Sequence, residues 1–158
     1  MNTQNKGVLG LDLGNTIVST TPHGKIAFDD AIRVINRIIR EVLSPQQVFI
    51  VSRVNQEQYI RAKAWIEEER LLEQTGILPE NIHWCAERSD KANICKTLGI
   101  TYFIDDRPEV VSHMLGIVPK RILFQANEED ILKFKDSLDG VIYTRTWKEI
   151  ERIFFPLN

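Results

Sequence analysis

Val8-Leu9-Gly10-Leu11-Asp12-Leu13-Gly14-Asn15-Thr16 is a short apolar run that ends in a carboxylate and continues into a loop of small and polar residues. The apolar part predicts a buried strand. Two later apolar runs end in the same way, one at Ser52 and one at the pair Asp105-Asp106. In open α/β sheets, ligands bind in the crevice outside the carboxyl ends of parallel strands. These strand ends, together with Lys91, therefore form one candidate site.

Apolar runs rich in strand formers alternate along the chain with longer segments of helical period. This alternation predicts an α/β fold, and we expect residues 1–158 to form a single domain with a doubly wound, mainly parallel sheet flanked by helices. The predicted strands are Val8–Leu11, Val48–Val51, Asn81–Cys85, Thr101–Ile104, Arg121–Phe124 and Val141–Tyr143.

Helices are indicated by apolar period and by end signals. Apolar residues recur at helical spacing from Ala31 to Leu43, where Asp29 or Asp30 stands at the cap position. Asn55 to Leu72 predicts one long charged helix, which either rims the site or is simply solvated. Ser89 is predicted to be the N-cap of a helix that ends at Gly99. Pro108 suits the first turn of the next helix.

Length and composition bound the class of protein. A chain of 158 residues that is 43% hydrophobic can bury one sizeable core. It has only Cys85 and Cys95, and Met1 to Lys6 is polar with no apolar signal segment, so we expect a cytoplasmic protein. No apolar run approaches the roughly 20 residues of a membrane span. A net charge of -2, from 20 basic and 22 acidic residues, gives no strong signal of nucleic-acid binding. The sequence is compatible with a monomer or a homo-oligomer.

The pair Asp105-Asp106 points to a metal. Adjacent carboxylates repel each other unless a cation or hydrogen-bond donors compensate, and Mg²⁺ binds one or two carboxylates together with phosphate oxygens and waters. The competing interpretation is that Asp106 only caps the helix that begins near Pro108. Lys91 follows a predicted helix start, where the helix dipole disfavours a cation, so it is either a site residue or a solvated surface lysine.

Asp12, Ser52 and Lys91 supply the other groups that phosphoryl transfer needs. Asp12 can act as a nucleophile or a ligand, Ser52 as a hydroxyl donor to a phosphoryl oxygen, and Lys91 as a cation. Phosphoryl transfer depends mainly on positioning and on neutralising spread negative charge, so these groups with Mg²⁺ form a sufficient set.

The order of these residues resembles that of the haloacid dehalogenase (HAD) superfamily, most of whose members are Mg²⁺-dependent phosphohydrolases. Asp12-Leu13-Gly14-Asn15-Thr16 is similar to its first motif, Ser52 after Val48-Phe49-Ile50-Val51 to its second, Lys91 to its third, and Ile104-Asp105-Asp106 to its fourth. The resemblance implies a HAD-like, Rossmannoid fold and hydrolysis through an aspartyl-phosphate at Asp12.

The same resemblance assigns roles to individual residues. It implies that Asp12 and Lys91 are catalytic, and that Ser52, Lys91 and Asn15 bind the phosphoryl group. The implied metal ligands are the carboxylates and one backbone carbonyl, contributed by Asp12, Asp105, Asp106 and Gly14.

Gly14 departs from the family's pattern, because phosphatases of this family usually carry a second aspartate two positions after the nucleophile. The usual general acid/base is then missing, and such a group is typically worth about 10²–10⁴ in rate. Asn15 and Thr16 do not titrate near neutral pH, and His23 is either a replacement from the following loop or a solvated histidine. We expect a slow or specialised phosphatase or, alternatively, a non-catalytic phosphate-sensing or interaction protein.

The intervals between motifs indicate a capless member. Family caps are inserted either just after the first motif or between the second and third, yet predicted helices occupy most of both intervals here. An open crevice in this family often goes with large phosphorylated substrates such as proteins or nucleic-acid ends, or with closure by a partner subunit.

Other classes share parts of this pattern. The string from Leu9 to Thr16 also resembles the first phosphate loop of the actin, Hsp70 and sugar-kinase ATPases, but 158 residues leave little room for their second domain. Those proteins follow the loop with a hairpin, whereas a helix is predicted here. A receiver domain carries its acidic pair early, and a dinucleotide fold needs a three-glycine loop. His83, Cys85 and Cys95 lack the spacing of a zinc site.

Overall fold

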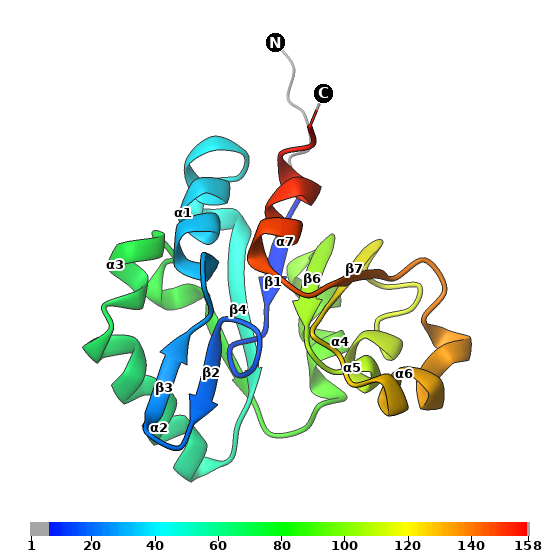
Figure 1. Cartoon of the computed structure of the whole chain (residues 1–158), viewed down its shortest axis with the longest axis horizontal. Helices are drawn as coiled ribbons and strands as arrows, with labels where there is room; N and C mark the ends of the chain where they lie inside the picture. Colours follow the sequence, from blue (N-terminus) through cyan, green and yellow to red (C-terminus); the bar gives the residue numbers. More distant parts are fainter. Residues whose placement is uncertain (1–6, 158) are drawn as a thin grey trace.

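The computed structural model describes residues 7–157, in which six parallel strands form a sheet between two layers of helices (Figure 1). In the order of the sheet, the strands are β5 (Ile82–Cys85), β4 (Val48–Arg53), β1 (Leu9–Leu11), β6 (Tyr102–Asp105), β7 (Lys120–Phe124) and β8 (Ile142–Thr144). Every neighbouring pair is parallel. The predicted fold class is therefore confirmed, and each predicted strand overlaps an observed one.

Strand β1 occupies the point where the strand order reverses. Its residues pair with β4 on one side and with β6 on the other, so the chain winds outward in both directions from this strand. A crevice forms at such a point, outside the carboxyl ends of the strands. The loop that starts at Asp12 therefore opens into the position where doubly wound proteins bind ligands.

The helices form two layers, one on each face of the sheet. Four of them share a hydrophobic core with one face of the central strands: α1 (Ala31–Glu41), α2 (Gln56–Glu68), α3 (Leu71–Thr75) and α7 (Trp147–Phe154). The opposite face is covered by α4 (Asp90–Leu98), α5 (Pro108–Ser112) and α6 (Glu128–Phe134). Three short 3-10 helices lie in connections, at Pro45–Gln47, Pro79–Asn81 and Lys135–Ser137. Both faces of a parallel sheet are buried in this way.

A hairpin follows the first loop, and this corrects the sequence-based expectation that none is present. Strands β2 (Val18–Thr21) and β3 (Gly24–Ala27) pair only with each other and form a separate two-stranded sheet. Most of their side chains are exposed or half-buried, so they lack the apolar run that revealed the main strands. The hairpin removes one argument against an actin-like ATPase.

Helix ends differ from prediction in two places. The predicted helix over Asn55–Leu72 is broken at Arg70, whose φ of 56° lies in the left-handed region, so α2 and α3 are separate. Ser89 precedes α4 but has helical angles and makes no capping hydrogen bond with its side chain. Gly99 ends α4 with a φ of 67°, and Pro108 is the first residue of α5, as predicted.

The C-terminal aromatic residues pack onto the body of the protein. Trp147 is buried, the ring of Phe154 lies 4.9 Å from that of Tyr102, and the guanidinium of Arg37 lies 3.8 Å from the centre of the Phe155 ring. No helix within residues 7–157 is long and apolar enough to cross a membrane.

Candidate active site

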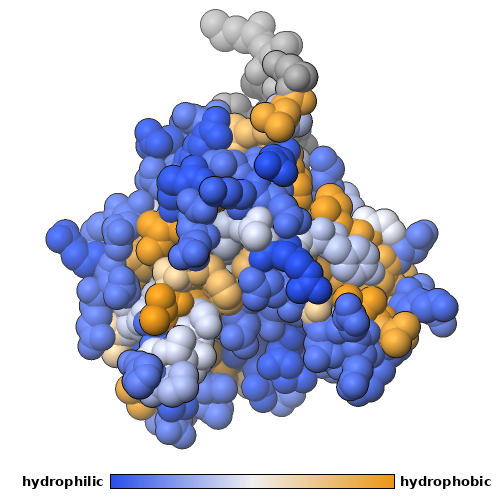
Figure 2. Space-filling model, in the orientation of Figure 1, coloured by the Kyte–Doolittle hydropathy of each residue, from blue (hydrophilic) through white to orange (hydrophobic). Residues whose placement is uncertain are grey.

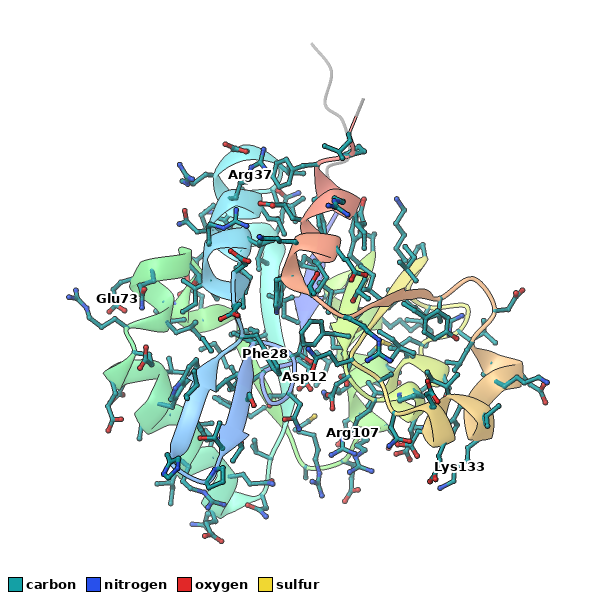
Figure 3. All side chains as sticks on the ribbon, viewed as in Figure 1. Asp12, Phe28, Arg37, Glu73, Arg107 and Lys133 are labelled. Carbon is teal, nitrogen blue, oxygen red and sulfur yellow. The ribbon has the colours of Figure 1, made fainter. Side chains whose placement is uncertain are left out.

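The carboxyl end of β4 and the loops that follow β1 and β6 line one open cleft. Asp12 directly follows β1, and its backbone N–H donates to the carbonyl of Ile104 in β6 at 3.0 Å. Ser52 lies near the end of β4, and both Asp12 and Ser52 line the cleft. In Figure 3, Asp12 lies at the centre of the molecule, with Arg107 below it toward the lower edge. The sheet thus brings together the strand ends that the sequence indicated.

Lys91 is the cation at the floor of the cleft. Its ammonium donates to Oδ1 of Asp12 at 2.9 Å and to Oδ2 of Asp105 at 2.8 Å. Lys91 is only 2% exposed and Asp105 is fully buried, so the interpretation of Lys91 as a solvated surface lysine is wrong. The backbone N–H of Arg107 donates to Oδ1 of Asp105 at 2.9 Å. Both oxygens of Asp105 are therefore engaged, one of them in holding Lys91.

The charges in this cluster are not balanced. Burial alone would lower the pKa of Lys91, but the carboxylates of Asp105 and Asp12 outweigh it and hold the pKa above its ordinary value. Burial also raises the pKa of Asp105, with a further contribution from Asp12. Burial together with the charges of Asp105 and Asp12 raises the pKa of Asp106 to about 9. One ammonium thus leaves two of the three carboxyl groups without a counter-charge.

Asp12, Asp105 and Asp106 can together hold a metal ion, because one oxygen from each lies within 4.8 Å of the others. The donor set is entirely oxygen, and a divalent ion would supply the two missing positive charges, which matches Mg²⁺. Within residues 7–157 no second group of this kind is found, so His83, Cys85 and Cys95 do not form one. Asp106 is not the N-cap of α5, since that position belongs to Arg107.

The loop after Asp12 has a fixed and unusual shape. Asn15 has a φ of 59°, and its N–H donates to the carbonyl of Val18 at 2.7 Å. Gly14 is exposed, and a Cβ atom built on it would have no neighbour within 4 Å. The carbonyl of Thr16 accepts a hydrogen bond of 2.9 Å from the indole N–H of Trp147 in α7. Gly14 and Asn15 both line the cleft.

Sequence analysis missed the basic side chains that line the cleft. Lys25 comes from β3, Arg53 ends β4, and Arg107 follows Asp106. A fourth, Arg88, is paired with Glu109 at 3.0 Å. Arg53 and Arg107 could have been found, because each directly follows a residue that the motifs had singled out. Figure 2, drawn in the orientation of Figure 1, shows mainly hydrophilic residues over the lower centre of the molecule.

Helix α2 forms one wall of the cleft, so the interpretation of the charged helix as a rim of the site is correct. Gln58, Ala62 and Trp65 line the cleft, and the indole N–H of Trp65 is buried without a hydrogen-bond partner. His23 lies in the exposed turn of the hairpin and is not among the lining residues. It therefore does not replace the missing acid in this structure.

Comparison with known proteins identifies the fold. No protein-family model matches the sequence, and no curated protein matches it in sequence. Among solved structures, D,D-heptose 1,7-bisphosphate phosphatase from B. bronchiseptica, solved with magnesium and phosphate, superposes with a TM-score of 0.67 at 13% identity, covering 94% of this chain and 98% of that chain. The corresponding phosphatase from Burkholderia thailandensis gives a TM-score of 0.58 at 13% identity, covering 96% and 99%.

A de novo designed Rossmann 3x3 fold protein is also similar, with a TM-score of 0.51, 15% identity and coverage of 94% and 93%. A shared architecture does not by itself indicate an activity, so function must be argued from the site. Residues 7–157 share the α/β fold of the two heptose bisphosphate phosphatases, with a six-stranded parallel sheet and no inserted cap domain.

Proposed function

We propose that the protein is a Mg²⁺-dependent phosphohydrolase that acts through an aspartyl-phosphate at Asp12. The observation that carries this proposal is the buried ammonium of Lys91, which is bound to Asp12 and Asp105 at the floor of an open cleft. Burying a lysine and two carboxylates carries a large desolvation free energy. Such a cluster is therefore better explained by its chemistry or its specificity than by a gain in stability. Both similar structures are phosphatases, and one of them was solved with magnesium and phosphate, which agrees with the chemistry of this cluster.

The chain's own residues can position a phosphoryl group for attack. Oδ1 of Asp12 is held by Lys91, which leaves the other carboxylate oxygen to attack phosphorus. The hydroxyl of Ser52, the ammonium of Lys91 and the amide of Asn15 are the donors for the phosphoryl oxygens. These groups neutralise and orient the spread charge on which phosphoryl transfer depends.

Mg²⁺ fits the acidic cluster. Asp12, Asp105, Asp106 and the backbone carbonyl of Gly14 would hold it, and Asp105 also accepts hydrogen bonds from Lys91 and from the backbone N–H of Arg107. When bound, the ion neutralises charge on the transferred group and on the carboxylates around it.

The open cleft suits a phosphorylated substrate that extends beyond it, including a macromolecular one. The hairpin and α2 both contribute residues to its lining, and residues 7–157 contain no inserted cap domain. Because position 14 is glycine, the turnover of ordinary phosphate esters is slow. The alternative function is phosphate sensing without turnover, which the same cluster and the same glycine also fit.

Phosphate release from a panel of phosphorylated small molecules, peptides and nucleic-acid ends, with Mg²⁺, tests the proposal. Asp12→Asn removes the nucleophile with little change in volume and is expected to abolish release. Asp136→Asn, at an exposed acid far from the cleft, is the matched control and keeps full activity. Release that persists in Asp12→Asn overturns the covalent mechanism. Mg²⁺ binding without turnover of any substrate favours the sensing alternative.

A further inference from the structure

We infer that Asp12 takes its phosphoryl group from acyl phosphates, and that the aspartyl-phosphate it forms is long-lived. This inference rests on the proposed function and adds to it the class of donor and the fate of the intermediate. It arises from two features of the cleft. Among the described residues that line it, Asp12 alone has a carboxyl group and none has an imidazole, and basic side chains surround the opening.

The first feature is the space at Gly14. A Cβ atom at this position would have no neighbour within 4 Å, so no other side chain has moved in to replace an acid there. Of the described residues that line the cleft, Asp12 is the only one with a carboxyl group, and none is histidine, cysteine or tyrosine. Lys91 donates two of its three N–H bonds to carboxylates, and the third is available to a phosphoryl oxygen. Apart from Asp12, the described lining therefore has no carboxylic acid or imidazole to protonate a departing alkoxide.

The second feature is the set of cations around the opening. Lys25, Arg53 and Arg107 line the cleft, and none of them forms an ion pair with another residue in the described part of the chain. The only side-chain hydrogen bond from Arg53 goes to the carbonyl of Ala86 at 3.3 Å. Arginine remains protonated in proteins, so it stabilises a departing anion by charge and does not give it a proton.

These features select the leaving group. In the first step, an oxygen of Asp12 forms a bond to phosphorus while the bond between phosphorus and the leaving oxygen breaks. The leaving group departs with the electron pair. The carboxylate that leaves an acyl phosphate is a stable anion and needs no proton. The alkoxide that leaves an alkyl phosphate is a strong base and needs a proton from a general acid as it departs. The missing acid costs an alkyl phosphate roughly 10²–10⁴ in rate and costs an acyl phosphate little.

The same absence slows the second step. Water must attack the phosphorus of the aspartyl-phosphate, release the Asp12 carboxylate and give its proton to solvent or to the phosphate product. In a family member with aspartate at this position, the carboxyl group that protonated the leaving group in the first step is left as a carboxylate and takes this proton from water. Glycine at position 14 offers no such group. The phosphorylated form of Asp12 therefore accumulates when an acyl phosphate is present.

Acetyl phosphate and ethyl phosphate are a matched pair of probes, since they have nearly the same size and differ in the leaving group. Each is incubated in Mg²⁺ with the wild-type protein, Gly14→Asp, Gly14→Asn and Asp12→Asn. The intact mass of the protein reports phosphorylation, and free phosphate reports turnover. Circular dichroism establishes that each variant is folded. Gly14→Asn is the control for Gly14→Asp because it has the same size and does not titrate.

We expect acetyl phosphate to add one phosphoryl group to the wild-type protein and to Gly14→Asn, with slow release, and ethyl phosphate to add none. Gly14→Asp shortens the lifetime of the phosphorylated form by roughly 10²–10⁴ and gains turnover of ethyl phosphate. Asp12→Asn stays unmodified.

Two results would overturn the inference, and they are distinguishable. Rapid release of phosphate from ethyl phosphate by the wild-type protein, with no accumulated phosphoryl group, keeps the proposed function and rejects the restriction to acyl phosphates. Failure of both donors with folded wild-type protein and folded Gly14→Asp rejects the proposed function as well.

Discussion

Lys91 organises the site at the scale of single residues, because one ammonium holds two carboxylates that would otherwise repel each other. Its side chain leaves the first turn of α4 and reaches Asp12 and Asp105, which lie at the ends of two different strands. This is why a lysine occupies a position that the helix dipole disfavours. The local cost is outweighed by two charge-assisted hydrogen bonds in a buried setting.

Lys91→Met is therefore expected to lower the free energy of unfolding by about 3–5 kcal/mol, since removal of one member leaves buried carboxylates uncompensated. Urea denaturation measures this change. Lys96→Met, at an exposed position of the same helix, is the control and should alter stability by no more than about 0.5 kcal/mol. Equal effects of the two substitutions would show that the buried ion pairs do not hold the site together.

The acidic and hydroxyl residues of the cleft were predictable because each follows an apolar strand. Asp12, Ser52 and the pair Asp105-Asp106 end such runs, and the rule that parallel strands present their carboxyl ends on one edge brings them together. Lys25 was not predictable, because a single lysine in a polar segment looks like any solvated charge. The space at Gly14 depends on three-dimensional surroundings that a sequence does not contain.

At the scale of elements, strand and helix signals differed in strength. The six main strands contain short apolar runs and were found, with ends shifted by at most two residues. The hairpin of β2 and β3 was missed because its side chains are largely solvated, although Thr21-Pro22-His23-Gly24 is a turn signal between its strands. The break at Arg70 had no signal, since arginine rarely adopts a positive φ.

Strand β1 depends on a close approach to its neighbours. A Cβ atom on Gly10 would lie 2.6 Å from the ring of Phe103 and 2.8 Å from Cδ1 of Ile100, both of which are buried. Gly10→Ala is expected to destabilise the protein by about 1–3 kcal/mol through overpacking. Gly14→Ala, where the added carbon meets nothing, is the control and should leave the urea midpoint almost unchanged. A midpoint for Gly10→Ala equal to that of the wild type would contradict the packing of this strand.

At the scale of the whole molecule, the excess of buried carboxylates links stability to pH and to metal. Without metal, the pKa of Asp106 rises from 3.8 to about 9 on folding, and that of Asp105 also rises. At pH values between 3.8 and about 9, the folded state binds more protons than the unfolded state, so the free energy of unfolding falls as the pH rises. Mg²⁺ binds the deprotonated carboxylates and opposes this loss.

The increase in melting temperature caused by Mg²⁺ should accordingly be larger at about pH 8 than at about pH 5, because fewer protons then compete with the ion. Thermal unfolding with and without Mg²⁺ at both pH values measures this difference. Asp106→Asn, which cannot ionise, is expected to reduce it. A shift that is the same at both pH values in the wild-type protein would argue against metal binding by this cluster.

The indole N–H of Trp147 donates to the carbonyl of Thr16, and this hydrogen bond joins the loop that follows Asp12 to a residue 131 positions later in the chain. During synthesis on the ribosome, a growing chain that has reached Asp106, just after β6, already contains Asp12, Ser52, Lys91 and both residues of the pair Asp105-Asp106. It still lacks α7, whose Trp147 holds the loop between β1 and the hairpin. This hydrogen bond can therefore form only after α7 has left the exit tunnel.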